Sequence, residues 1–447
     1  MNETRQLADW VVKTSYGDLP GEVVEAARIY ILDNLASGFA GAELPWTRIV
    51  SNMARESSTG VCSVFGSSPT TSPSAAALIN GVAIGGFETD HPFTAGSCHP
   101  SGAVFPAVLA AAETIGLDGK SFLTAIATGY EALCRVGLAA TRAVEDERGF
   151  HGPGTNAPIG GAIGAAKALG FDSRQMVNAI GIAVSHGGGL LEFHREGAMT
   201  KRLHLGRGSQ LGLESALLAQ RGFTGPSTGL EGDHGFLHVY SPAPQTHELL
   251  NEIGVKYRML DITVKAFPCH VSFHAVIEAL VRFKEAHPLD PARITSFEIV
   301  SQSRMMEERF GARSVSTLMG AQYSMPWSCA LTLCHDTSDP SAWSEASLQD
   351  SLVRQIAAGI KLREEQPSDP TALAEVIIEY DGKREIITAT DWKGAPTNPC
   401  TFQDMARKFQ RYAGSMLVSS RVQEIIERVG RLEDEADLAD FATLIRA

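Results

Sequence analysis

The chain has 447 residues, of which 44% are hydrophobic and 20% are charged, and its formal net charge is −13. A chain of this length exceeds the size of one ordinary hydrophobic core, so we expect two domains. The acidic balance disfavours nucleic acid and anionic membranes as partners, although a few local lysines and arginines would still admit a small anionic substrate.

Helical spacing of apolar residues dominates the first half of the chain. Two amphipathic segments begin it, one around Trp10 and one around Tyr30, and a turn at Gly17 and Pro20 separates them. Small-residue repeats such as residues 160–166 predict close contact between helices, either inside the core or at a dimer interface. Further helices are predicted at residues 74–84, 104–115, 121–139, 159–169, 175–185 and 209–221.

The pattern changes near residue 255. Residues 294–300 alternate as a strand, and residues 376–388 predict a hairpin around the turn Asp381-Gly382. Helices are expected at 275–285 and 348–359 and, beyond a break at 394–399, at 402–413 and 420–429. We therefore predict a mainly α protein with a large all-helical domain (residues 1–262), a smaller α/β domain (263–397) and C-terminal helices (398–447) that return to the helical domain.

Four short polar islands interrupt the apolar background, and each places a titratable residue beside Gly, Pro or Ser. The first island contains Glu88, Asp90 and His99. Two carboxylates and a histidine can divide into an acid and a base if burial separates their pKa values. The alternative is turn formation by Asp90 and an exposed Glu88. His99 and Ser101 also begin a predicted helix, whose N–H groups would suit a substrate carboxylate.

The second and third islands contain His151 and Lys201. His151 lies between glycines at the start of a predicted helix, and an unperturbed imidazole exchanges protons near neutral pH. A lone histidine is otherwise more often structural. Lys201 has small and apolar neighbours, which favours a lysine that points inward, to bind a carboxylate or act as an acid, over a solvated surface cation.

The fourth island contains Lys265, Cys269 and His270 before a predicted helix. His270 and His274 are four residues apart, so on one helix they would share a face and could bind a metal together with Cys269. The zincin pattern requires a glutamate after the first histidine, and Val271 stands there, so we expect no metal. Cys269 as a covalent nucleophile is a further alternative.

Other features narrow the class of protein. The sequence contains no P-loop, no dinucleotide-binding GxGxxG unit and no GxSxG elbow. Its seven cysteines lack paired spacing, which is typical of reduced intracellular thiols. The N-terminus leads directly into an amphipathic segment without a signal peptide, and no apolar run is long enough to span a bilayer. We therefore expect a cytoplasmic protein.

Together these segments resemble the MmgE/PrpD family in order and approximate spacing over nearly the whole chain. The resemblance implies a large helical domain, an α/β lid domain, an active site in the cleft, a homodimer and no organic cofactor. It also implies that Asp90, His99, His151, Lys201, Lys265 and His270 match the family's site. The motifs that carry it are residues 77–81 leading to Asp90, 99–101, 149–151, 200–206, 265–270, 321–324 and 394–399.

Members of this family act on small polycarboxylates at a carbon next to a carboxylate, among them 2-methylcitrate, cis-aconitate and iminodisuccinate. The sequence departs from the family pattern in two places. The stretch around Asp90 carries fewer aspartates, and Trp327 stands where the family has a tyrosine. Both departures favour epimerisation over dehydration or decarboxylation, and within the family the sequence is most similar to members that epimerise iminodisuccinate.

We therefore predict a cofactor-independent epimerase that acts on the α-carbon of a small dicarboxylate, iminodisuccinate, by removal and return of a proton between two bases. Two alternatives remain: a hydro-lyase of the 2-methylcitrate dehydratase type, and a non-catalytic polycarboxylate-binding protein. The predicted catalytic residues are His151, Asp90, His99 and His270, and the predicted substrate-binding residues are Lys201, Lys265, Ser101 and Trp327.

Overall fold

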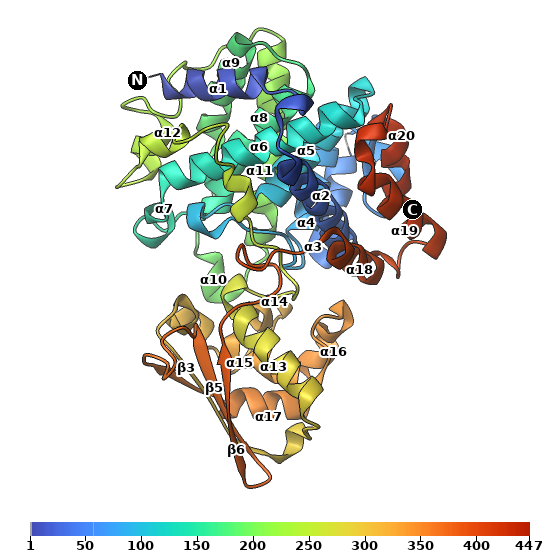
Figure 1. Ribbon diagram of the computed structural model, residues 1–447. Helices are drawn as coiled ribbons and strands as arrows, with labels where there is room; N and C mark the ends of the chain where they lie inside the picture. Colours follow the sequence, from blue (N-terminus) through green and yellow to red (C-terminus); the bar gives the residue numbers. More distant parts are fainter. Residues whose placement is uncertain (1, 57) are drawn as a thin grey trace. The chain divides into compact units, whose positions relative to one another are not determined.

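The computed structural model describes residues 2–56 and 58–447, and contacts within the chain divide it into two units (Figure 1). The first unit comprises Met1–Phe193, Met199–Thr263 and Cys400–Ala447. The second comprises His194–Ala198 and Val264–Pro399. The predicted fold class, mainly α with a smaller α/β part, is confirmed.

Almost all of the regular secondary structure in the first unit is helical, and a small antiparallel hairpin of β1 (Cys62–Val64) and β2 (Ser67–Thr71) completes it. The short helices are α7 (Ala143–Asp146), α12 (Phe236–Tyr240) and α20 (Leu438–Ala442), and α10 (Phe193–Glu196) crosses the boundary between the units in the chain. The longer helices are α1 (Glu3–Lys13), α2 (Gly21–Ala42), α3 (Pro45–Arg55), α4 (Pro73–Ile84), α5 (Pro100–Ile115), α6 (Gly119–Ala140), α8 (Gly152–Ala168), α9 (Ser173–Ala183), α11 (Thr200–Gln220), α18 (Phe402–Ala413) and α19 (Ser419–Gly430).

Two kinds of sequence pattern place these helices. Helices α4, α5 and α8 carry small or apolar residues around the whole circumference, and nearly all of their residues are buried. A helix that is apolar on every side has no face suited to water, so it lies inside. Helices α1, α18 and α19 carry apolar residues on one face only, and that face alone is buried. The helices predicted from residue 74 to residue 185 are confirmed, with earlier starts for α5 and α8.

The prediction for α11 was wrong at its start, because the helix begins at Thr200 rather than at residue 209. Two glycines of low helix propensity, Gly206 and Gly208, lie in the part of the helix before residue 209. In the structure they let α11 approach its neighbours closely: a Cβ at Gly206 would lie 2.4 Å from the carbonyl O of Leu78, and one at Gly208 would lie 2.3 Å from Cβ of Ala157. Tight packing against α4 and α8 therefore offsets the low helix propensity of glycine.

The same close packing explains the repeat at residues 160–166. A Cβ at Gly160 would lie 2.6 Å from Cδ2 of Leu133, and one at Gly164 would lie 2.7 Å from Cγ2 of Val108. These glycines therefore pack against α6 and α5 inside the first unit. The core-packing interpretation of the repeat is confirmed.

The second unit contains a four-stranded sheet in the order β4-β3-β5-β6. Its strands are β3 (Ile294–Ser301), β4 (Lys361–Glu364), β5 (Ala374–Tyr380) and β6 (Lys383–Ala389). Strands β3 and β4 are parallel, whereas β3 with β5 and β5 with β6 are antiparallel. The predicted hairpin is confirmed, and its turn residues Asp381 and Gly382 have positive φ angles of 52° and 73°. The helices of this unit are α13 (His274–Ala286), α14 (Leu318–Gln322), α15 (Met325–Cys334), α16 (Glu345–Leu348) and α17 (Ser351–Gly359).

A search of residues 2–56 and 58–447 finds no helix with both the length and the apolar character needed to cross a bilayer.

Candidate active site

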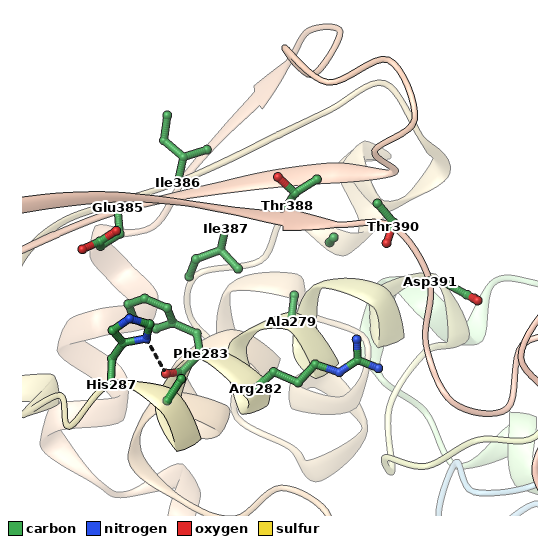
Figure 2. Close-up of a pocket in the computed structure, with 12 residues that line it drawn as sticks. Ala279, Arg282, Phe283, His287, Glu385, Ile386, Ile387, Thr388, Thr390 and Asp391 are labelled. Atoms are coloured by element: carbon green, nitrogen blue, oxygen red, sulfur yellow. Dashed lines mark hydrogen bonds between the residues drawn. The ribbon is translucent and has the colours of Figure 1, made fainter.

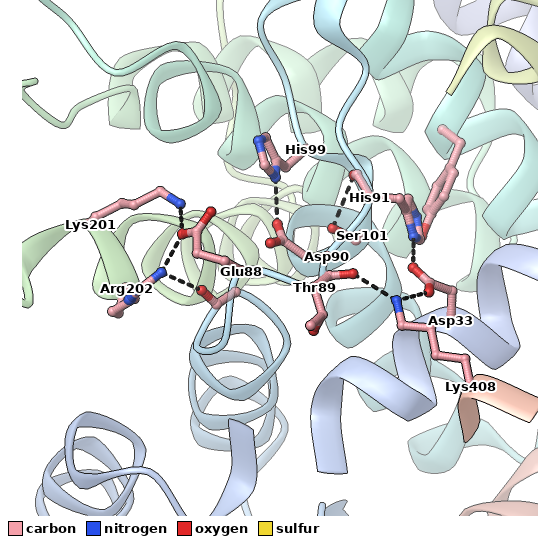
Figure 3. A network of polar contacts seen from close by, with 12 residues as sticks. Asp33, Glu88, Thr89, Asp90, His91, His99, Ser101, Lys201, Arg202 and Lys408 are labelled. Carbon is pink, nitrogen blue, oxygen red and sulfur yellow. Dashed lines mark hydrogen bonds and ion pairs between the residues drawn. The ribbon is translucent and has the colours of Figure 1, made fainter. Parts of the chain in front are cut away.

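The loop after α4 begins with a buried cluster of three charged side chains (Figure 3). The carboxylate of Glu88 accepts hydrogen bonds from Nζ of Lys201 and Nη1 of Arg202, both on α11. Glu88 is fully buried and has a positive φ of 62°, a strained conformation for a residue other than glycine. The guanidinium of Arg202 also faces the ring of Trp46, 5.3 Å from its centroid. We call these three side chains the cationic cluster, because it contains two basic side chains and one carboxylate.

The next carboxylate of the loop forms the His99–Asp90 pair. Nδ1 of His99, the residue that caps α5, donates a hydrogen bond to Oδ2 of Asp90. A carboxylate acceptor at Nδ1 leaves the lone pair of a neutral imidazole on Nε2. The side chain of His99 is 15% exposed, whereas that of Asp90 is 1% exposed. Within residues 2–56 and 58–447, Nε2 of His99 has no hydrogen-bond partner, so this nitrogen is available to exchange a proton.

The same loop contains a second histidine, His91, which forms the His91–Asp33 pair. Its Nδ1 lies 2.7 Å from Oδ2 of Asp33, and its Nε2 lies 3.1 Å from the hydroxyl of Tyr130. Both side chains of the pair are fully buried. Burial raises the pKa of Tyr130 well above its usual range, so its hydroxyl keeps its proton. A neutral His91 therefore fits here, with Nδ1 as donor and Nε2 as acceptor.

Lys408 of α18 completes the surroundings of Asp33. Its Nζ lies 2.5 Å from Oδ1 of Asp33 and 3.0 Å from the carbonyl O of Thr89. Burial opposes ionisation of Asp33, but Lys408 and then His91 outweigh it and lower the pKa of this carboxyl group. Asp33 is therefore an ionised carboxylate in the core.

Ser101 belongs to this network as well. It is fully buried at the start of α5, and its hydroxyl donates a hydrogen bond of 3.4 Å to the carbonyl O of His91. This contact ties the loop to α5. Its role in substrate binding stays a prediction.

A third histidine pair lies at the start of α8. His151 caps this helix, and its Nδ1 lies 2.9 Å from Nδ1 of His204 on α11. Burial and then the nearby charge of Lys201 lower the pKa of His204 to about 4, so His204 is neutral at pH 7. A hydrogen bond between the two Nδ1 atoms needs one N–H donor and one acceptor. The pair therefore offers a second set of groups that can hold a proton.

Glycine contacts bring these elements together within the first unit. A Cβ at Gly152 would lie 2.5 Å from the carbonyl O of Ser97, two residues before His99. A Cβ at Gly154 would lie 3.2 Å from Cβ of His204. The start of α8 therefore packs against both the segment that leads to His99 and the helix that carries Lys201. The structure thus brings Asp90, His99, His151 and Lys201 into one region.

Three further predicted residues lie in the second unit. Lys265 is buried, and His270 caps a short 3-10 turn, Val271–Phe273. The ring of His270 packs against Phe310 and Tyr323, with centroids 4.4 Å and 5.3 Å apart. Their membership of one site with the residues of the first unit stays a prediction.

Trp327, the third of these, lies on α15 and is almost fully buried. Its indole Nε1 donates a hydrogen bond of 3.2 Å to the carbonyl O of Arg313. The indole proton is therefore bonded to the main chain. An indole N–H also lacks the acidity of a phenol, so Trp327 cannot supply the proton that a tyrosine could.

The predicted sharing of a helix face by His270 and His274 was wrong. The helix α13 begins only at His274, and His270 precedes it in the 3-10 turn. The backbone at His270 is extended, so the helical spacing of side chains does not reach back to this residue. His274 packs against the rings of Phe267 and Trp392. In the described part of the chain, no three or more His, Cys, Asp or Glu side chains form a group that could hold a metal ion.

A cavity of about 330 Å³ lies in the second unit between α13 and β6 (Figure 2). Its wall includes Phe283 and His287 of α13 and Ile387 of β6. Nδ1 of His287 lies 3.2 Å from the carbonyl O of Phe283. The described residues that line this cavity come from none of the four polar islands, so we do not place the chemistry there.

Sequence reasoning missed several residues of this region. It assigned no role to His204, because the late predicted start of α11 hid that His204 follows Lys201 by three residues on one helix face. It assigned none to Arg202, and it weighed Glu88 only as a minor carboxylate. Asp33 and Lys408 carried no local signal, because they are 375 positions apart in the chain.

Comparison with known proteins finds relatives that match nearly the whole chain. The sequence matches the profile of the MmgE/PrpD N-terminal domain over residues 5–249 and that of the MmgE/PrpD C-terminal domain over residues 267–434. It is 27% identical to a cis-aconitate decarboxylase-like protein, oryM, of Aspergillus oryzae, over 99% of this chain and 97% of that protein. It is 28% identical to cis-aconitate decarboxylase of Homo sapiens, over 99% and 94%, and 25% identical to that of Aspergillus terreus, over 99% and 95%.

Proposed function

We propose that this chain, which belongs to the MmgE/PrpD family, is an enzyme. It acts on a small polycarboxylate at a carbon next to a carboxylate. The observation that carries the proposal is the His99–Asp90 pair on the loop whose Glu88 binds Lys201 and Arg202 of α11. The pair can exchange a proton, and the two basic side chains can attract an acid group.

The cationic cluster supplies the attraction. Its basic side chains, Lys201 and Arg202, both bind Glu88, and all three side chains are buried. In such surroundings a positive charge acts more strongly on an anion than it would in water. It would hold one substrate carboxylate and stabilise the negative charge that spreads onto that group when a bond to the neighbouring carbon breaks.

The imidazole of His99 supplies the proton transfer. Asp90 orients the ring and stabilises the imidazolium form that arises when Nε2 takes a proton, as a carboxylate does in other acid–base pairs. The His151–His204 pair is the second candidate, and it lies where α8 meets the segment that leads to His99. Two separate imidazole groups allow a proton to leave from one face of a carbon and to return on another.

We place the reaction first among the lyases, because the similar proteins are named cis-aconitate decarboxylases. In a decarboxylation the bond between carbon and carboxyl group breaks, and carbon dioxide leaves. The electron pair stays on the substrate, and an imidazolium delivers a proton to it. His99 in its protonated form is our candidate for that donor.

Epimerisation of a dicarboxylate such as iminodisuccinate is the second candidate, and Trp327 favours it. The indole of Trp327 is bonded to the carbonyl O of Arg313 and has no proton to give. Epimerisation needs only removal and return of the same kind of proton, which two imidazole groups can perform. It does not need a separate acid to expel a leaving group.

The test is turnover of three acids, cis-aconitate, 2-methylcitrate and iminodisuccinate, followed by NMR in deuterated water. Loss of carbon dioxide from cis-aconitate would establish the decarboxylase, and loss of water from 2-methylcitrate would establish the dehydratase. Inversion of iminodisuccinate with deuterium at the α-carbon would establish the epimerase.

Binding of these acids without turnover or exchange would contradict the proposal and favour a non-catalytic binding protein. The control is the same incubation with heat-denatured protein, which corrects for spontaneous decarboxylation and exchange.

A further inference from the structure

A lysine from the C-terminal part of the chain reaches the loop that carries Asp90. Lys408 lies on α18, 319 positions after Thr89, and its Nζ is 3.0 Å from the carbonyl O of Thr89. The same Nζ is 2.5 Å from Oδ1 of Asp33 on α2. The side chain of Lys408 is only 8% exposed. A buried lysine needs such partners, because burial of an unpaired charge is very costly.

The hydrogen bonds around Asp33 run in one consistent direction. Nδ2 of Asn34 lies 2.8 Å from the hydroxyl of Tyr130 and must donate to it. Tyr130 then donates to Nε2 of His91, and Nδ1 of His91 donates to Asp33. Asp33 accepts from His91 on one oxygen and from Lys408 on the other. Every member has a defined role, so the network holds one arrangement of the loop.

The loop is therefore held on both sides of Asp90 (Figure 3). Before Asp90, Glu88 binds Lys201 and Arg202, and the carbonyl O of Thr89 accepts a hydrogen bond from Lys408. After Asp90, the ring of His91 binds Asp33. Asp90 lies between Thr89 and His91 in the chain, so its carboxylate has little freedom to leave Nδ1 of His99.

We infer that Lys408 is a positioning residue for the His99–Asp90 pair: its bonds to Asp33 and to the carbonyl of Thr89 keep Asp90 in line with Nδ1 of His99. The expected effect on turnover rests on the proposed function. The expected effect on the imidazole does not, because the orientation of the ring can be measured without substrate.

The experiment compares the wild-type protein with Lys408→Met, which keeps much of the aliphatic stem but removes the donors. Long-range 1H–15N NMR of protein labelled in histidine reads the tautomer of His99, and the signal is assigned by its loss in His99→Gln. The wild type should show the Nδ1–H tautomer, and Lys408→Met should show a mixture with Nε2–H. Turnover should fall by about 10- to 100-fold in kcat, as for a misplaced catalytic group, with KM changed less than about twofold.

Two control variants separate positioning from general damage. Lys408→Arg keeps the charge and the donors, so it should restore most of the turnover and the wild-type tautomer. Arg407→Met changes the neighbouring residue on α18, which is 63% exposed and paired with Asp404, and it should leave both readouts unchanged. If Lys408→Met does not fold, the double variant Asp33→Asn with Lys408→Met removes the uncompensated buried charge and is measured instead.

A wild-type tautomer of His99 in folded Lys408→Met, or in the double variant if that is the one that folds, would overturn the inference. Wild-type kcat in that variant would overturn it as well. If no polycarboxylate is turned over by the wild type, yet the tautomer changes in Lys408→Met, the proposed function fails and the inference stands.

Discussion

Two histidines of one loop, His91 and His99, each pair with an aspartate, but the two pairs have different surroundings. In both, Nδ1 of the histidine meets Oδ2 of an aspartate, in the His91–Asp33 pair and in the His99–Asp90 pair. The side chain of His91 is 0% exposed, and its Nε2 meets Tyr130. The side chain of His99 is 15% exposed, and in the described residues its Nε2 makes no hydrogen bond. The surroundings of Nε2 therefore distinguish the two pairs. A buried, hydrogen-bonded Nε2 suits a structural role, and an exposed Nε2 suits contact with a substrate.

The comparison also shows how one pair supports the other. A buried pair whose donors and acceptors are all satisfied is rigid, and rigidity is what a catalytic carboxylate next to it needs. The buried pair should therefore govern stability first and turnover second. The exposed pair should govern turnover and leave stability nearly unchanged.

The largest expected effect is on turnover in His99→Gln. Glutamine can still donate to Asp90 but cannot exchange a proton, so kcat should fall by about 10²–10⁴-fold. Thermal unfolding should remain close to wild type, because the replaced side chain reaches the surface. A kcat within a few fold of wild type would remove His99 from the mechanism and erase the difference between the two pairs.

The next effect is on stability in His91→Leu. This change leaves one oxygen of Asp33 and the hydroxyl of Tyr130 without their buried partner, which should lower the free energy of unfolding by about 2–4 kcal/mol. Urea unfolding measures it, and His99→Gln is the matched control. Equal stability of the two variants would show that burial does not distinguish the pairs.

The His151–His204 pair gives a pH-dependent test. The folded-state pKa of His204 is about 4, below the unfolded value near 6.5, so the unfolded chain binds more protons between these pH values. The contribution of His204 to stability is therefore full above pH 6.5 and is lost as the pH falls towards 4, by at most about 2–3 kcal/mol. Urea unfolding of wild type and His204→Gln across this range measures the difference. Parallel pH profiles for the two proteins would count against a buried, neutral His204.

The smallest effect is expected in Ser101→Ala. The hydroxyl of Ser101 donates one long hydrogen bond to the carbonyl O of His91, so its loss should cost about 0.5–1.5 kcal/mol of stability. KM for the substrate should change little if this bond is its main role. A rise in KM of tenfold or more, at unchanged stability, would instead assign Ser101 to substrate binding.

Much of the fold was predictable from local patterns. Helices α4, α5, α6, α8 and α9 follow from apolar spacing, and the hairpin of β5 and β6 follows from the turn Asp381-Gly382. The start of α11 could not be predicted, because glycines such as Gly206 and Gly208 often end a helix. Here they allow close packing against α4 and α8, which a single sequence does not reveal. The prediction that His270 and His274 share a helix face was also wrong. His270 precedes a 3-10 turn, so the two residues do not belong to one α-helix.

The candidate site was predictable in its residue types and not in its pairings. Asp90 and His99 are nine residues apart, and their setting among Gly, Pro and Ser pointed to chemistry. His91 finds its partners on the distant helices α2 and α6, and Lys201 pairs with Glu88, 113 positions away in the chain. No local pattern in the sequence indicates these partners. An exposed Glu88 was one of the alternatives, because a carboxylate is seldom buried, but Lys201 and Arg202 stabilise its buried charge.

The central claim is that Nε2 of His99 exchanges a proton with a carbon next to a substrate carboxylate. The most direct measurement is deuterium incorporation at that carbon in deuterated water, followed by NMR for wild type, His99→Gln and His91→Gln at equal folded concentration. The account predicts rapid incorporation by wild type, slower but clear incorporation by His91→Gln, and almost none by His99→Gln. Incorporation by His99→Gln at the wild-type rate would contradict it.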